Sequence, residues 1–352
     1  MSFSTSRPCR SKYIKGSTKK LEDIGLKKEK CVGQGFDGAP NMAGYLSGTC
    51  VRINKIYPKA LYVHCASHRL NLAISQAMSV PMLKNALENV ERITKLFRKN
   101  GHAAFVLENT IKLYAPEKTK HRLIGYCQTR FIERHDCLDL FVEYFEYIAI
   151  TLQEISEDTS RCISAKASTY LAMIEKSEFI VSVLVSKKVL SLTNYLSILL
   201  QEPKLDLMAA IELAKTVVSS AKTMRNNSNE NFQEIFNEAT SLAKRIFKSD
   251  ITISRQGRLR NPDVNSVEGF YRVSCFLPGL DNLQQQLENI LINNSNLLSS
   301  FQYLFPGFAK PENVKNLKKL SIYYEDYCTY SSLEGEYKNW CETSKKLDKK
   351  QK

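Results

Sequence analysis

The sequence has 352 residues, more than one domain usually holds, and its 43% hydrophobic and 24% charged residues are typical of a globular protein that buries a core. Ten cysteines without a single CxxC pair argue against zinc-ribbon and thioredoxin-like sites and favour reduced, mostly buried thiols. The formal net charge of +14 invites a nucleic-acid partner, and the N-terminus lacks the apolar stretch of a secretory signal.

The first third of the chain predicts a basic tail followed by an α/β region. Residues 1–28 are rich in Ser and Lys, and we expect them to be a disordered tail with one short helix near Leu21–Leu26. Residues 29–131 contain two strand–helix units. The strands are predicted at Cys31–Phe36 and Ala60–His64, and the helices at Gly48–Ile56 and Cys65–Ala77.

The pattern then becomes helical. Apolar residues from Leu83 to Phe97 share one helix face, and Gly101 is predicted to end that helix as its C-cap. Between Leu138 and Ile155 apolar residues recur in steps of three and four, which predicts one core-facing helix of about five turns. Residues 132–250 are therefore expected to form a helical domain without strands. Its later helices are predicted at Ile174–Leu200, Met208–Ala221 and Phe232–Ile246.

The most apolar stretch of the chain, Phe179–Leu200, is interrupted by Lys187, Lys188 and several Ser residues. It falls short of the ~20 apolar residues that a membrane span needs. We therefore expect a soluble, intracellular protein with no membrane contact.

The last hundred residues are predicted to return to mixed structure. An exposed Arg-rich loop, Ser254–Pro262, leads to a candidate strand at Tyr271–Phe276. Short helices and a Lys-rich tail, residues 343–352, complete the chain. Residues 1–31 carry nine Lys or Arg against three acids, and residues 338–352 carry six Lys against two acids, so the ends hold most of the positive charge. Basic ends attract phosphate, and they are equally common as solubilising tails.

Asp37 is the first candidate for chemistry. It follows a predicted buried strand and precedes Gly38 and Ala39. Two-metal phosphoryl transfer uses three or four such carboxylates, brought together from distant segments to bind Mg²⁺ or Mn²⁺. Considered alone, however, an Asp-Gly pair more often forms a simple turn.

Cys65 and His68 lie at positions i and i+3, on one face of a helix start. Zinc would need two more ligands at readable spacing, and the remaining Cys and His residues do not supply them. A packed Cys/His pair at a strand–helix junction is the stronger interpretation.

Arg130 and Phe131 precede the helix predicted from residue 132. An Arg at a helix start can clamp a phosphate, and a Phe can stack on an unpaired base. The alternative is a capping Thr129 followed by a core Phe131.

Together these segments resemble a known family. Cys31–Gly44 and Ala60–Leu72 are similar to the core of hAT-superfamily DNA transposases, in the branch that includes zinc finger MYM-type and THAP-repressor-like proteins of animals. Asn261–Leu291 and Leu333–Trp340 match later segments of that branch. The resemblance implies a predominantly helical α/β fold. In it, a partial RNase H-like core at residues 29–131 is interrupted by the helical insertion at 132–250 and resumes over 251–342, where the C-terminal region also begins.

The resemblance also implies roles for individual residues. Asp37 would be the second of three carboxylates that bind two Mg²⁺ or Mn²⁺ ions. Cys65 and His68 match the family's CxxH motif, and Arg130-Phe131 its Arg-Trp motif, both near the DNA. The first Asp and the Glu-Arg-x-Phe-Ser segment that carries the Glu have no counterpart in these residues. The implied protein is a nuclear, truncated product of a transposable element that has no resident cofactor, binds DNA weakly and does not cut it.

Two other functions stay open. The helical block could be a domesticated module that docks protein partners without nucleic acid. Alternatively, a full-length partner could supply the missing carboxylates in trans and complete a nuclease. Salt-dependent binding to duplex DNA would separate DNA binding from the protein-docking alternative.

Overall fold

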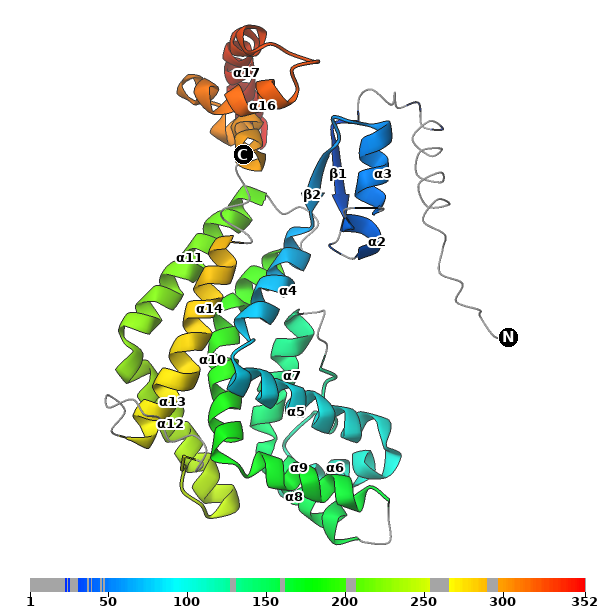
Figure 1. Cartoon of the computed structure of the whole chain (residues 1–352), viewed down its shortest axis with the longest axis vertical. Coiled ribbons are helices and arrows are strands. Elements are labelled where there is room, and N and C mark those ends of the chain that lie inside the picture. Colours follow the sequence, from blue (N-terminus) through cyan, green and yellow to red (C-terminus); the bar gives the residue numbers. More distant parts are fainter. Residues whose placement is uncertain are drawn as a thin grey trace. The chain divides into compact units, whose positions relative to one another are not determined.

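The computed structural model describes residues 31–36, 38, 40–44, 46, 48–126, 131–158, 162–200, 207–253, 266–289 and 297–351, with residues 23 and 25. The chain divides into two compact units (Figure 1). The first unit comprises residues 1–69 and 293–352, and the second residues 70–292. Helices dominate both. The domain boundaries expected from the sequence, at 131/132 and 250/251, remain predictions, because compactness does not report which segment was inserted into which.

Two short parallel strands form the sheet of the first unit. Strand β1 (Gly33–Phe36) pairs with β2 (Leu61–His64), with Gly33 opposite Leu61 and Phe36 opposite His64. The chain crosses between them through α2 (Pro40–Ala43) and α3 (Thr49–Ile56), and α4 (Ala66–Ala77) follows β2 directly. Both strands and helices α3 and α4 lie where the sequence predicts them.

A buried amide fixes this crossover. Nε2 of Gln34 donates to the carbonyl oxygen of Ala60 at 3.1 Å, to that of Cys50 at 3.3 Å and to Oδ1 of Asn54 at 2.5 Å. Because unpaired buried polar groups cost about 1–3 kcal/mol, these partners hold β1, α3 and the entry to β2 in one arrangement.

The C-terminal segment of the first unit packs around Leu317, Tyr337 and Cys341. The hydroxyl of Tyr324 donates to the carbonyl oxygen of Val32 at 2.8 Å, and Nζ of Lys59 donates to that of Tyr323 at 3.1 Å, so both ends of the chain contribute to one unit. Helix α17 continues through the segment expected to be a Lys-rich tail. The helices are α15 (Leu298–Phe301), α16 (Lys318–Tyr323) and α17 (Tyr330–Gln351).

The second unit is a bundle built around α10 (Ser177–Leu199), which contacts helices on both sides in Figure 1. Residues 132–247 contain no strand among those described, as predicted. The other helices are α5 (Pro81–Lys99), α6 (Gly101–Tyr114), α7 (Phe131–Glu143), α8 (Phe145–Glu157), α9 (Ser164–Ile174), α11 (Leu207–Asn226), α12 (Ser228–Leu242), α13 (Val267–Tyr271) and α14 (Leu277–Leu287).

Helix α10 is long and apolar enough to cross a membrane, but 67% of its most apolar window is buried within the protein. Its neighbours are α5, α7, α11, α12 and α14. A mostly buried apolar helix with neighbours on several sides is the core helix of a bundle, although Ser191, Tyr195 and Ile198 near its C-terminal end are exposed.

Asn100, not Gly101, ends α5, so the predicted C-cap at Gly101 is wrong. Asn100 is extended, with φ −102° and ψ 116°, and its Oδ1 accepts from the backbone N–H of Ala103 at 3.0 Å. One residue therefore terminates α5 and caps α6, a helix that the sequence analysis did not predict.

The single helix predicted from Leu138 to Ile155 is two helices that meet at Tyr144, where φ is −98° and ψ is 13°. The apolar stripe nevertheless buries as expected: Phe141, Phe145 and Leu152 are at most 3% exposed. The apolar stripe therefore predicts correctly which helix faces are buried. The break at Tyr144 changes the direction of the chain, and these faces stay buried on both sides of it.

The strand predicted at Tyr271–Phe276 is also wrong, because the segment is helical. Ser266 caps the helix by accepting from the N–H of Gly269 at 2.9 Å, and Arg272–Phe276 form a π-helical turn. Pro278 follows after Leu277 and, because it lacks an N–H, cannot complete the regular helical ladder, so the preceding turn widens. This helical turn places Tyr271, Cys275 and Phe276 in the bundle core.

Candidate nucleic-acid interface

The carboxyl end of the β1–β2 pair is the first part of the candidate site. The N–H of Cys65 donates to the carbonyl oxygen of Phe36 at 2.9 Å, which carries the pairing one step past β2. Asp37 is the next residue after β1 in the sequence but lies outside the described residues. Its predicted role as a catalytic, metal-binding carboxylate therefore remains a prediction.

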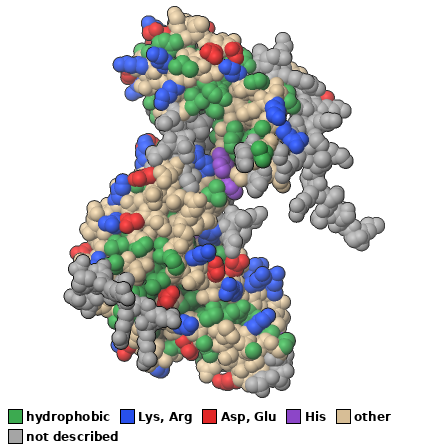
Figure 2. Space-filling view, in the orientation of Figure 1, with side chains coloured by type: hydrophobic (Ala, Val, Ile, Leu, Met, Phe, Trp, Pro, Cys, Tyr) green, Lys and Arg blue, Asp and Glu red, His purple; other side chains and the backbone are tan. Residues whose placement is uncertain are grey.

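Two imidazoles, those of His64 and His68, lie beside this end of the sheet. Their ring centroids are 5.2 Å apart, and the ring of Tyr62 lies 6.2 Å from that of His64. A methyl group added to Gly38 would lie 2.5 Å from Cε1 of His64 and 2.9 Å from Cδ2 of His68. Gly38 is therefore required by close approach, and Figure 2 shows the histidine side chains at the surface where β2 meets α4.

Cys65 is exposed at the start of α4, while His68 is half-buried on the same helix. The carbonyl oxygen of Cys65 accepts from the N–H of Arg69 at 2.9 Å, in the first turn. Within the described part of the chain, no group of three or more His, Cys, Asp or Glu side chains could share a metal ion. Cys65 and His68 thus lie together as the sequence spacing requires, and their predicted DNA contact stays untested.

Arg69 was not predicted as a site residue from the sequence. Its guanidinium is half-buried and forms no hydrogen bond with any described residue, and burial lowers its pKa from the usual range. A desolvated cation favours an anionic partner. The available sequence signal was its position, directly after His68 in the Cys-x-x-His motif.

The predicted Arg130–Phe131 contact lies at the start of α7 in the second unit. Arg130 is outside the described residues; Phe131 begins the helix, but its side chain is not described. The nearby Arg134 is buried, donates to Oγ of Ser75 at 3.3 Å, and stands 5.7 Å from the ring of Tyr126. Burial raises the pKa of Tyr126 to about 12, so this phenol stays neutral. Arg134 anchors the helix that follows Arg130.

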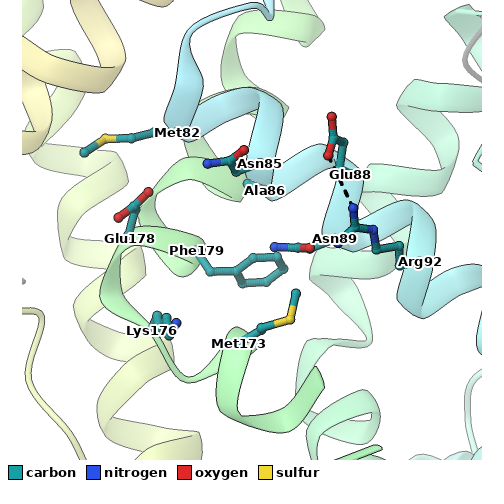
Figure 3. Close-up of a pocket in the computed structure, with 10 residues that line it drawn as sticks. All are labelled: Met82, Asn85, Ala86, Glu88, Asn89, Arg92, Met173, Lys176, Glu178 and Phe179. Atoms are coloured by element: carbon teal, nitrogen blue, oxygen red, sulfur yellow. Dashed lines mark ion pairs between the residues drawn. The ribbon is translucent and has the colours of Figure 1, made fainter. Parts of the chain in front are cut away.

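A hollow of about 400 Å³ opens between α5 and the α9–α10 connection (Figure 3). Glu88 and Arg92 form an ion pair across one turn of α5, at 3.6 Å. Polar and sulphur-containing side chains lie together in the wall: Met82, Asn85, Asn89, Met173 and Glu178. Such a mixture suits a polypeptide better than a phosphate, because Met side chains adapt to varied surfaces and amides pair with backbone groups.

Comparison with known proteins identifies distant relatives. The chain is similar to animal repressor proteins. It is 25% identical over 289 residues to the human 52 kDa repressor of the inhibitor of the protein kinase, and 24% identical over 290 residues to the mouse protein of that name. Each alignment covers 79% of this chain and 38% of the relative. No family model and no solved structure matches the sequence.

The chain therefore spans well under half the length of the relatives it matches. The similarity supports a distant relationship to repressor proteins. This similarity alone does not extend to hAT transposases or to an RNase H-like core.

Proposed function

We propose that this chain is a transposase-derived, hAT-like protein of the nucleus that binds DNA weakly and does not cut it. The observation that carries the proposal is a cluster of residues at the end of the β1–β2 pair: the neighbouring imidazoles of His64 and His68, and the half-buried Arg69 that follows His68 in the chain. Open α/β sheets bind ligands beyond the carboxyl ends of their parallel strands. The cluster stands at that position.

The chemistry of the cluster fits a phosphate backbone. Arg69 provides a cation whose surroundings already exclude part of its water, so a charge-assisted hydrogen bond to phosphate would be stronger there than at an open surface. The net charge of +14 adds long-range attraction to the same partner. The distant similarity to proteins named as repressors supports a nuclear, DNA-associated role.

Cleavage is not expected from these 352 residues alone. Two-metal hydrolysis places the ions ~3.5–4 Å apart, and several anionic ligands must offset their repulsion. By the resemblance, Asp37 is one of three such carboxylates, and the segments that would carry the other two have no counterpart in this sequence. Mg²⁺ or Mn²⁺ would have a single implied ligand.

Fluorescence anisotropy with labelled duplex DNA over a series of salt concentrations tests the binding. We expect affinity that falls steeply with salt. Arg69→Gln should weaken binding roughly 10-fold, the loss of one charge-assisted contact of about 1.5–3 kcal/mol. Arg92→Gln, which removes an exposed cation paired with Glu88, is the matched control and should change little. Binding that is absent, or insensitive to Arg69→Gln, would contradict the proposal.

A plasmid-nicking assay in Mn²⁺ tests the expectation that the chain does not cut DNA. The wild-type chain should leave plasmid intact, as should Asp37→Ala. Nicking that disappears in Asp37→Ala would show that other acids complete a metal site.

A protein-docking module is the second candidate function. The hollow of Figure 3, whose wall includes Met82, Met173 and the amides of Asn85 and Asn89, favours it. A chain that shows no salt-dependent DNA binding but retains affinity for peptides, lost on Asn85→Ala with Asn89→Ala, would support this alternative instead.

A further inference from the structure

A basic groove runs along the last two turns of α5 in the second compact unit (residues 70–292, the helical unit). Lys95, Arg98 and Lys99 lie at i, i+3 and i+4, so their side chains share one helix face about 5–6 Å apart. They line a hollow of about 330 Å³ against the segment that ends at Gly125 and Tyr126, with Glu91 as the one acidic residue of its lining. Figure 2 shows Lys and Arg side chains in the region of α5, with acidic side chains beside them.

These three cations lack counterions. None of them forms an ion pair with any residue that the structure describes, whereas Arg92, Lys112 and Arg122 each pair with a Glu. Like charges at this spacing destabilise a helix by about 0.2–0.5 kcal/mol per pair. The helix dipole favours Arg98 and Lys99 in the last turn, but it does not account for Lys95 one turn earlier.

Gly125 shapes the groove. Its backbone is not left-handed, so its conformation does not require glycine. A methyl group there would instead lie 2.7 Å from Cζ of Arg98. The guanidinium of Arg98 rests on the Cα of Gly125, which places the charge between two hollows.

The groove is extended. Arg98 also lines a second hollow of about 330 Å³ with His121 and Arg122. Tyr126 joins the first hollow to a third of about 360 Å³, but Glu88 and Glu91 line that hollow together with Lys84, so the cations continue only toward Arg122. Several cations in a row beside an aromatic ring suit a linear polyanion better than a single phosphate, because successive phosphates along the strand can each find a cation.

We propose that this groove, from Lys95 past Arg98 to Arg122, holds the phosphate backbone of DNA. The inference rests on the proposed function and adds a second contact surface to it, in a different compact unit from Arg69.

The test compares two triple variants of the full chain. Lys95→Gln/Arg98→Gln/Lys99→Gln removes the groove cations. Lys315→Gln/Lys318→Gln/Lys319→Gln removes three exposed lysines with the same i, i+3, i+4 spacing in the other unit. Circular dichroism establishes that both variants fold. We expect the groove variant to bind duplex DNA roughly 10- to 100-fold more weakly at about 0.1 M salt, with a salt slope shallower by about two to three, and the control variant to stay near wild type.

Gly125→Ala tests the placement of Arg98 without changing the charge. It should displace the guanidinium and weaken DNA binding roughly 3- to 10-fold, by loss of one oriented charge-assisted contact. A competition experiment shows which anionic ligand the groove prefers. Unlabelled duplex DNA should displace the labelled DNA probe efficiently, while inorganic phosphate and poly-glutamate should not.

Each outcome is decisive. A groove variant that binds like wild type, or no worse than the control, would overturn the groove while leaving DNA binding by the chain intact. Displacement by poly-glutamate as efficient as by DNA would assign the groove to acidic proteins and overturn the inference. Absence of DNA binding by the wild-type chain would overturn both the groove and the proposed function.

Discussion

At the level of single residues, two glycines set the positions of charged or titratable side chains. Gly38 admits the rings of His64 and His68, and Gly125 admits the guanidinium of Arg98. Neither glycine has a positive φ. At each glycine, a neighbouring side chain occupies the space that a Cβ would take.

Gly38→Ala should therefore destabilise the first unit. The added methyl group must push apart two packed imidazoles, and overpacking of this kind costs about 1–3 kcal/mol. Urea unfolding followed by the fluorescence of Trp340, the single Trp in the chain, measures the loss. Trp340 is anchored in the same unit, where its Nε1 donates to the carbonyl oxygen of Leu304 at 2.8 Å.

Gly33→Ala is the matched control on the same strand. Its methyl group would lie 3.9 Å from the carbonyl oxygen of Leu61, an ordinary contact, so it should be neutral or stabilise by up to about 1 kcal/mol. Equal stability of Gly38→Ala and the wild type would show that the imidazoles move aside freely.

At the level of elements, α10 organises the helical unit and contains two fully buried serines one turn apart. Oγ of Ser182 lies 3.7 Å from Sγ of Cys275 on the π-helical turn, in a hydrogen bond that either atom can donate. Oγ of Ser186 has no hydrogen-bond partner among the described residues. Burial raises the pKa of Cys275 to about 12, so its thiol stays protonated and able to donate.

Ser186→Ala should raise the free energy of unfolding of the helical unit by about 1 kcal/mol, because it removes a buried polar group that has no partner. Ser182→Ala should give a smaller gain or a loss, since it breaks the contact with Cys275. Both variants gain the same helix propensity, so the difference isolates the hydrogen bond. Urea unfolding followed by far-ultraviolet circular dichroism measures it, and equal effects would contradict the assignment.

At the level of the whole molecule, two compact units predict two separable unfolding transitions. Far-ultraviolet circular dichroism reports mainly the helical unit, which holds most of the described helices, and Trp340 reports the first unit. Leu190→Ala leaves a cavity in the core of the helical unit, which should cost about 2–5 kcal/mol and lower the urea midpoint seen by circular dichroism.

The Trp340 transition should stay in place in Leu190→Ala. Leu317→Ala, in the core of the first unit, should give the converse result. If both probes shift together in either variant, the two units unfold as one cooperative block.

Much of the fold could be predicted from local patterns. The apolar runs before Asp37 and Cys65 predicted β1 and β2, and three- and four-residue spacing predicted which faces of α5, α7 and α8 are buried. The same patterns failed at Tyr271–Phe276, where the chain forms a widened helical turn before Pro278 instead of a strand. At Gly101 the general preference of helix ends for glycine was outweighed by the cap that Asn100 provides.

The candidate sites divide in the same way. The sequence by itself determined the pairing of Cys65 with His68 and the clustering of Lys95, Arg98 and Lys99, because residues three or four apart on a helix must be neighbours. Only the tertiary structure decided that Arg98 rests on Gly125 and that Gly38 faces two imidazoles. Those contacts join segments whose spacing along the chain carries no periodic signal, and they exist only once helix packing and strand pairing have fixed the backbone around them.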